Sequence, residues 1–248
     1  MTKTTDQPQD AIDVHIVMVL DESGSMAGLR DDLIGGVNKF LADQRSKPGK
    51  CRLTLVKFAP YTVLADAVDI KDVADLTHAT YNPQSMTPLF DAEGRAINEA
   101  LAREEKRARK GKSKEAVLFV TYTDGDNNTS REFTRESLSK LKAERSEAGW
   151  TFLYLGVGHD AYGQSSSMGT STANTRSRSK SARGMATVFS DVNNVATAYR
   201  TAAFVGDADT IVASSADAYS ALNVDAPVDE AEAEAKWATS TAKDTATV

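Results

Sequence analysis

The chain has 248 residues, 41% hydrophobic and 26% charged, with a formal net charge of −6, which is the composition of a water-soluble protein long enough for one α/β domain with a sizeable core. A single cysteine, Cys51, excludes an intrachain disulfide. The polar residues 1–13 do not resemble a secretory signal, and no apolar run approaches the ~20 residues that span a bilayer, so we expect a cytoplasmic protein without a membrane segment.

Strand-like and helix-like segments alternate along the chain. Short apolar or alternating runs predict strands over residues 14–20, 52–58, 61–64, 116–121 and 151–157, with 61–64 as an antiparallel edge strand. Apolar residues at helical spacing predict helices over 29–41, 89–101, 133–148 and 186–199. This alternation is typical of βαβ units, and it predicts an α/β fold with a mostly parallel central sheet and helices on both faces.

Two segments break the alternation. Residues 163–184 are rich in Ser, Thr and Arg, which predicts a long mobile loop with a short edge strand near 172–175. Residues 207–248 contain nine acidic and two basic residues, with a weak helix predicted over 211–222 and almost nothing to bury from residue 226. We therefore predict a flexible N-terminus over 1–11, one domain over 12–206, and an acidic, largely disordered tail over 207–248.

Oxygen-bearing side chains follow the two most apolar strands. Asp21-Glu22-Ser23-Gly24-Ser25 comes directly after the apolar run 16–20, and Asp124 follows the run 116–120. Thr87 lies between them in the sequence, before a predicted helix. Ligands of open parallel sheets bind beyond the carboxyl ends of the strands, where the strand order reverses. An oxygen-only set of ligands at that place suits a hard divalent cation, Mg²⁺ or Mn²⁺.

The pattern Asp-x-Ser-x-Ser, then a distant Thr and a distant Asp, resembles the metal-ion-dependent adhesion site of von Willebrand factor type A domains. All five positions are filled, by Asp21, Ser23, Ser25, Thr87 and Asp124, and the resemblance covers roughly residues 12–205. It implies a Rossmann-like fold whose first and fourth strands lie side by side. Further stretches, 31–41 and 130–134, resemble small stand-alone bacterial and phage members of the family.

The resemblance also implies a role for each residue. Ser23 and Ser25 would coordinate the ion directly, and Thr87 would join them when a ligand is bound. Asp21 and Asp124 would hold metal-bound waters and orient the serines. Neutral hydroxyls leave the cation attractive to an exposed Asp or Glu of a partner. The expected function is therefore a non-enzymatic, Mg²⁺-dependent protein-binding module, adhesive or adaptor-like, in the cytoplasm or on a virion if the chain is phage-encoded.

Two alternatives stay open. The first is a virion or filament subunit, which would use the site or the tail for self-association. The second is a Mg²⁺-dependent phosphohydrolase, because Asp21 and the run 123–126 superficially resemble haloacid-dehalogenase-type phosphatases. That mechanism needs an acid where Ser23 stands, so we assign no catalytic residue. The basic run over 103–114 lacks interleaved aromatic residues, and it favours a solvated helix end over a nucleic-acid surface.

Overall fold

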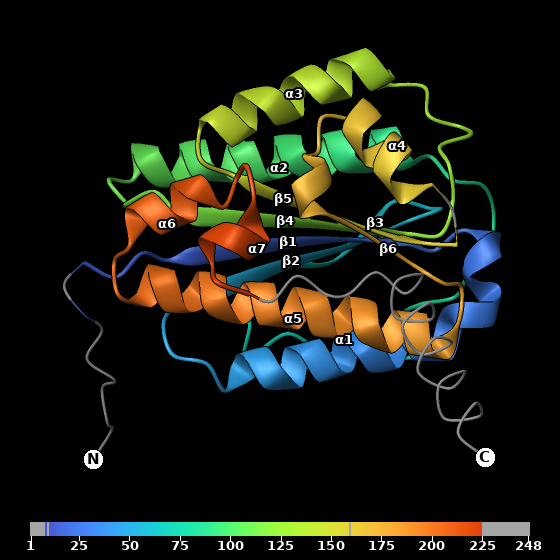
Figure 1. The fold of residues 1–248 in the computed structure, drawn as a ribbon, viewed down its shortest axis with the longest axis horizontal. Helices are drawn as coiled ribbons and strands as arrows, with labels where there is room; N and C mark the ends of the chain where they lie inside the picture. Colours follow the sequence, from blue (N-terminus) through green and yellow to red (C-terminus); the bar gives the residue numbers. More distant parts are fainter. Residues whose placement is uncertain (1–7, 9, 159, 225–248) are drawn as a thin grey trace, which may run out of the picture.

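The computed structural model describes residues 8, 10–158 and 160–224 (Figure 1). The predicted flexible segment 1–11 lies largely outside these residues. In chain order the elements are β1 (Val14–Asp21), η1 (Gly24–Leu29), α1 (Arg30–Arg45), β2 (Cys51–Phe58), β3 (Thr62–Asp69), α2 (Leu89–Arg109), β4 (Ala116–Thr123), α3 (Arg135–Glu147), β5 (Thr151–Val157), α4 (Ala161–Ser167), η2 (Thr172–Asn174), β6 (Thr175–Arg178), α5 (Ala182–Phe204), α6 (Ala208–Ala213) and α7 (Ala218–Ala221).

The strands form one six-stranded sheet in the order β3-β2-β1-β4-β5-β6. Every neighbouring pair is parallel except β2 and β3, so β3 is the antiparallel edge strand that the sequence predicts. After β1 the chain passes through α1 to β2 on one side, and later through α2 to β4 on the other. The strand order therefore reverses between β1 and β4, which leaves a crevice at their carboxyl ends. The predicted fold class is confirmed.

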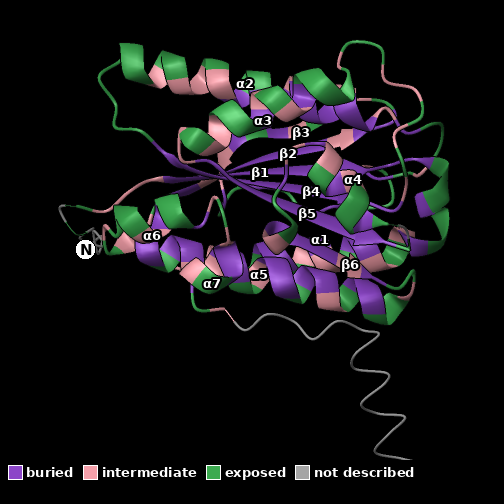
Figure 2. Cartoon of the chain, turned by 45° about the horizontal axis from the view of Figure 1, so that its top comes forward, coloured by how far each residue is buried: buried purple, intermediate pink, exposed green. Residues whose placement is uncertain are grey.

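Both faces of the sheet are covered by helices. Successive side chains of β1 point to opposite faces, so Ile16 and Met18 pack in one core and Val17 and Val19 in the other. Helices α1 and α5 cover the first core, and α2 and α3 cover the second (Figure 1). The central strands β1 and β4 and their neighbour β5 are buried throughout, as Figure 2 shows in purple, whereas the edge strand β3 is only partly buried. None of the helices within the described ranges is long and apolar enough to cross a membrane.

The predicted loop over 163–184 is structured instead. It contains α4, η2 and the edge strand β6, and it runs into the start of α5. Its buried polar groups satisfy one another: Ser165 Oγ lies 2.7 Å from Thr175 Oγ1, and Arg178 pairs with Asp191 at 3.1 Å. The edge strand predicted near 172–175 is present as β6, a few residues later. Because buried polar groups need partners rather than apolar character, the hydrophobic pattern of the sequence does not reveal the rest of this segment.

The predicted start of the tail at residue 207 is too early. Asp207 accepts a hydrogen bond from the Thr210 backbone N–H and Asp217 one from Ser220, both at 3.0 Å, so these acids cap α6 and α7. The short helices bury apolar side chains in the first core, and the Arg176 guanidinium stacks over the Tyr219 ring at 3.4 Å. Residues 225–248, where disorder is also predicted, lie outside the described residues.

A buried ion pair joins α2 to α3 on the face of the sheet that these helices cover. Lys142 Nζ lies 2.8 Å from Glu93 Oε2, and both side chains are at most 1% exposed. Lys142 also donates to Thr170 Oγ1 at 2.9 Å, and Thr121 of β4 donates to Glu93. Removing one member of such a pair leaves the other charge buried without a counter-ion, which costs about 3–5 kcal/mol.

We therefore expect Lys142→Met to lower the free energy of unfolding by about 3–5 kcal/mol, as measured by urea denaturation. The double variant Lys142→Met/Glu93→Gln should recover part of the loss, because it removes the unpaired charge. Lys140→Met, an exposed position on the same helix, is the matched control and should change the stability by no more than about 0.5 kcal/mol. Equal losses at positions 140 and 142 would show that the ion pair is not the cause.

Candidate metal centre

The five predicted residues gather at the carboxyl ends of β1 and β4. Asp21 is the last residue of β1, and Asp124 directly follows β4. Ser23 is the N-cap of η1 and Ser25 its second residue, and Thr87 directly precedes Pro88, the N-cap of α2. Ser25 is exposed, whereas Asp21, Ser23, Thr87 and Asp124 are buried. The site thus has a buried floor with one hydroxyl at its surface.

Asp21 is a buried anchor for the first loop. Its Oδ1 accepts a hydrogen bond from the Ser23 backbone N–H at 2.7 Å, and its Oδ2 accepts one from Thr123 Oγ1 at 2.6 Å. Burial raises the pKa of the Asp21 carboxyl; the hydrogen bonds from Ser23 and Thr123 lower it, and the charge of Asp124 raises it. Among the described residues no basic group lies within ion-pair distance of Asp21. The carboxylate therefore lacks the positive charge that a bound cation supplies.

A chain of hydrogen bonds leads from Asp21, through the backbone N–H of Ser23 and then the hydroxyls of Ser23 and Ser25, to Asp124. Ser23 Oγ lies 3.0 Å from Ser25 Oγ, and Ser25 Oγ donates to Asp124 Oδ1 at 2.6 Å. Since the Ser25 proton is used on Asp124, Ser23 is the donor to Ser25. Oxygen lone pairs of both serines are left for another electrophile. Four of the predicted residues are thus linked by hydrogen bonds. Ser25 and Asp124 are 99 residues apart in the sequence, and they meet because β1 and β4 are neighbours in the sheet.

Thr87 faces the same place from a third segment. A β-carbon at Gly125 would lie 3.9 Å from both Ser25 Oγ and Thr87 Oγ1, so the two hydroxyls flank this glycine. The Thr87 backbone N–H donates to Asn128 Oδ1 at 2.8 Å, and the Asn128 N–H donates to the Thr87 carbonyl at 3.0 Å. Asn128 thus holds Thr87 in position. The absence of a side chain at Gly125 leaves the approach to both hydroxyls open.

Glu22 stabilises the segment that carries Thr87, a role that the sequence did not reveal. It is 1% exposed, and its Oε1 lies 2.8 Å from Lys57 Nζ. The same oxygen accepts from the Asn82 backbone N–H, and the Glu22 carbonyl accepts from the Gln84 N–H at 2.8 Å. Glu22 is therefore neutralised by Lys57. Its contacts hold residues 82–84 in place, so we do not count it among the candidate metal ligands.

Lys180 is the second residue that sequence analysis missed. Its Nζ lies 2.6 Å from Asp124 Oδ2, although it belongs to the turn between β6 and α5. The Asp124 side chain is 0% exposed and that of Lys180 is 42% exposed. No sequence motif links Asp124 to Lys180, because the two residues meet only when β6 is paired with the sheet.

The donor set suits a hard cation. All five side chains offer oxygen, two as carboxylates and three as hydroxyls. The described residues contain no cluster of three or more His, Cys, Asp or Glu side chains that could hold a metal ion, so soft or imidazole-rich coordination is absent from them. A site here depends on hydroxyls and on the buried charge of Asp21, and this arrangement fits Mg²⁺ or Mn²⁺.

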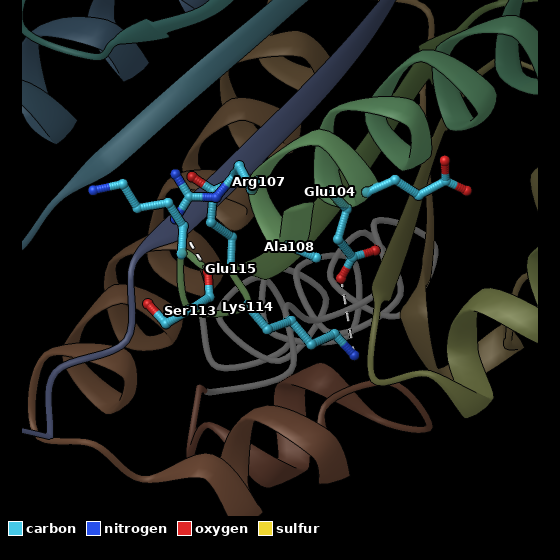
Figure 3. A pocket seen from close by; sticks show the side chains of 8 residues that line it. Glu104, Arg107, Ala108, Ser113, Lys114 and Glu115 are labelled. Carbon is cyan, nitrogen blue, oxygen red and sulfur yellow. Dashed lines mark hydrogen bonds and ion pairs between the residues drawn. The ribbon is translucent and has the colours of Figure 1, made fainter. Parts of the chain in front are cut away.

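The opposite edge of the sheet has a different character. A cavity of about 320 Å³ lies between the end of α2 and the start of β4 (Figure 3). Arg107 pairs with Glu115 at 3.1 Å and with Asp13 at 3.4 Å, and Arg103 pairs with Glu115 at 3.1 Å. The charges of the predicted basic run are therefore partly used to fasten α2 to the starts of β1 and β4.

The comparisons with known proteins concern the domain as a whole. The model of the von Willebrand factor type A domain matches residues 15–208. A comparison with curated proteins returned no match. Similar solved structures include proximal thread matrix protein 1 from the mussel byssus with a zinc-occupied MIDAS motif, at 15% identity and TM-score 0.51, where 75% of this chain and 48% of that chain are covered.

Two further solved structures share the fold. The pilus adhesin SpaC from Lactobacillus rhamnosus GG, in its open conformation, matches at 13% identity and TM-score 0.56, with 78% of this chain and 31% of that chain covered. The manganese-loaded Plasmodium vivax TRAP protein matches at 15% identity and TM-score 0.50, with 74% of each chain covered. The chain thus spans about half the length of the mussel protein and about a third of the adhesin. At these identities the likeness shows the fold alone.

We expect Asp21→Asn to weaken Mg²⁺ or Mn²⁺ binding by about 10- to 100-fold, measured by isothermal titration calorimetry. The amide keeps an oxygen for the Ser23 N–H and can donate to Thr123 Oγ1, which is free to donate to the Gly125 carbonyl at 3.1 Å. The fold should therefore persist, with an unchanged circular dichroism spectrum. Asp126→Asn removes the same charge from an exposed position beside the site and should leave affinity within about twofold. Equal binding by Asp21→Asn and the wild type would refute the site.

Proposed function

Because the chain belongs to the von Willebrand factor type A domain family, we propose that it is a protein-binding module that works with a divalent cation, Mg²⁺ or Mn²⁺. The cation would be held by Asp21, Ser23, Ser25, Thr87 and Asp124. The observation that carries this proposal is the hydrogen-bonded chain from Asp21 through Ser23 and Ser25 to Asp124. It places carboxylate and hydroxyl oxygens from the ends of two strands next to one another.

The bound cation would supply positive charge and an open coordination position for a carboxylate of the partner. The chain's own residues prepare that position. Asp21 holds the Ser23 backbone, Asp124 orients the Ser25 hydroxyl, and Asn128 fixes Thr87. Three of the five donors are neutral, so the site carries too little negative charge to satisfy a divalent ion. An exposed Asp or Glu of a partner protein completes the balance.

Two features weigh against the phosphohydrolase alternative. Asp21 is 0% exposed, and each of its carboxylate oxygens accepts a hydrogen bond, from Ser23 and Thr123, which makes it a poor nucleophile toward an external phosphate ester. The residue two positions later is Ser23, which is not a comparable general acid. The adjacent acid, Glu22, is paired with Lys57. We therefore propose a binding role without catalysis.

The first test is a pulldown with wild-type and Asp21→Asn protein as bait, each in Mg²⁺ and in EDTA. Partners should be recovered only by the wild type in Mg²⁺. Replacing one exposed Asp or Glu of a recovered partner by its amide should abolish its binding, because the amide cannot complete the charge of the site. Equal recovery in EDTA would contradict the proposal. Recovery of the chain itself as the partner would favour the virion or filament subunit.

The second test concerns catalysis. We expect no Mg²⁺-dependent hydrolysis of phosphate esters above the rate of a buffer blank, because Asp21 is engaged and no second acid is suitably placed. The assay uses a chromogenic phosphate monoester with the purified chain at several metal concentrations. Turnover that disappears in Asp21→Asn but persists in Asp126→Asn would overturn the binding role and favour the phosphohydrolase.

A further inference from the structure

We propose that Lys180 is a tethered counter-cation of the metal centre, which occupies Asp124 in the metal-free protein and is displaced by a divalent ion. The inference rests on the proposed metal site and adds a residue outside its predicted five. Its basis is the contact of Lys180 Nζ with Asp124 Oδ2 at 2.6 Å. This oxygen is the one that Ser25 leaves unused, since Ser25 donates to Oδ1.

The lysine stem is guided to the site by its surroundings. A β-carbon at Gly158, which has a φ of +76°, would lie only 2.9 Å from Lys180 Cβ and 3.4 Å from Cδ. The stem therefore crosses the backbone at a position where only glycine leaves room. An exposed lysine without such packing samples many rotamers. Here the contact with Gly158 restricts the rotamers of Lys180 to those that extend toward Asp124.

The backbone on both sides of Lys180 is fixed as well. The Gly158 N–H donates to the Arg178 carbonyl at 2.9 Å, which ties the end of β6 to β5. On the other side, Ser181 caps α5 by accepting from the Gly184 N–H at 3.1 Å. Lys180 is thus held between a strand end and a helix cap, so its contact with Asp124 does not depend on a free loop.

The charges explain why a divalent ion is required. Asp21 and Asp124 contribute two negative charges, and Lys180 balances one of them. A monovalent ion that replaced the ammonium at Asp124 would gain nothing in charge. A divalent ion interacts with both carboxylates, and it repels an ammonium group only a few ångströms away. The 42% exposure of Lys180 means that the displaced ammonium can move into solvent.

The test compares Lys180→Met with Lys140→Met, which removes the same charge from an exposed position on α3. Calorimetric titration of the full chain with Mg²⁺ should show about tenfold tighter binding by Lys180→Met, because the competing charge is gone. Lys140→Met should bind within about twofold of the wild type. Without metal, Lys180→Met should melt at a lower temperature than the wild type, since Asp124 has lost its partner, and Mg²⁺ should raise its melting temperature by more.

A second readout observes the lysine itself. Acetylation of wild-type protein by an N-hydroxysuccinimide ester, followed by mass spectrometry, should modify Lys180 faster in Mg²⁺ than in EDTA. Lys140 should react equally in both. Unchanged Mg²⁺ affinity in Lys180→Met together with metal-independent labelling of Lys180 would overturn this inference alone. Failure of both the wild type and the variant to bind Mg²⁺ or Mn²⁺ would instead overturn the metal site, and the inference with it.

Discussion

The parallel pairing of β1 with β4 is the constraint on which the candidate site depends. Their register runs from Val14 opposite Ala116 to Leu20 opposite Tyr122, so the two strands end together. Since the crossovers from these strands leave in opposite directions, no crossover helix passes over their shared end. The hydrogen bond from Thr123 Oγ1 to Asp21 Oδ2 spans this junction and sets the distance between the two acidic loops.

Three buried acids, Asp21, Glu22 and Asp124, lie at this end of the sheet, and the fold balances each differently. Glu22 has its own lysine, Lys57, and serves the loop that carries Thr87. Asp124 contacts Lys180, which comes from a distant turn. Asp21 has hydrogen bonds only, and burial raises the pKa of its carboxyl despite them. Asp21 is thus the acid of the three that has no basic partner among the described residues.

The two ends of the sheet use ionic groups in opposite ways. At the amino-terminal ends of the strands, Arg103 and Arg107 are both paired with Glu115, so these charges are balanced within the protein. At the carboxyl-terminal end, the serine hydroxyls lie against the carboxylate of Asp124, and Ser25 is an exposed residue. Paired charges of fixed geometry favour stability, whereas neutral donors around an unbalanced charge favour binding. The candidate binding site lies at the carboxyl ends of β1 and β4, where the strand order reverses.

Apolar periodicity in the sequence predicted the fold class and the antiparallel edge strand, because these depend on local patterns. The five oxygen-bearing residues were named by their resemblance to the motif of the family, which is also a local sequence pattern. The sequence predicted the edge strand β6 a few residues early and took the surrounding segment for a mobile loop, because the polar side chains there find partners in α4 and α5. It placed the end of the folded body too early, because Asp207 and Asp217 add to the acidity of the region while capping helices. Only the tertiary structure brought Lys57 to Glu22 and Lys180 to Asp124. Such pairs join residues far apart in the chain, and their energy depends on burial and distance, which no spacing along a sequence records.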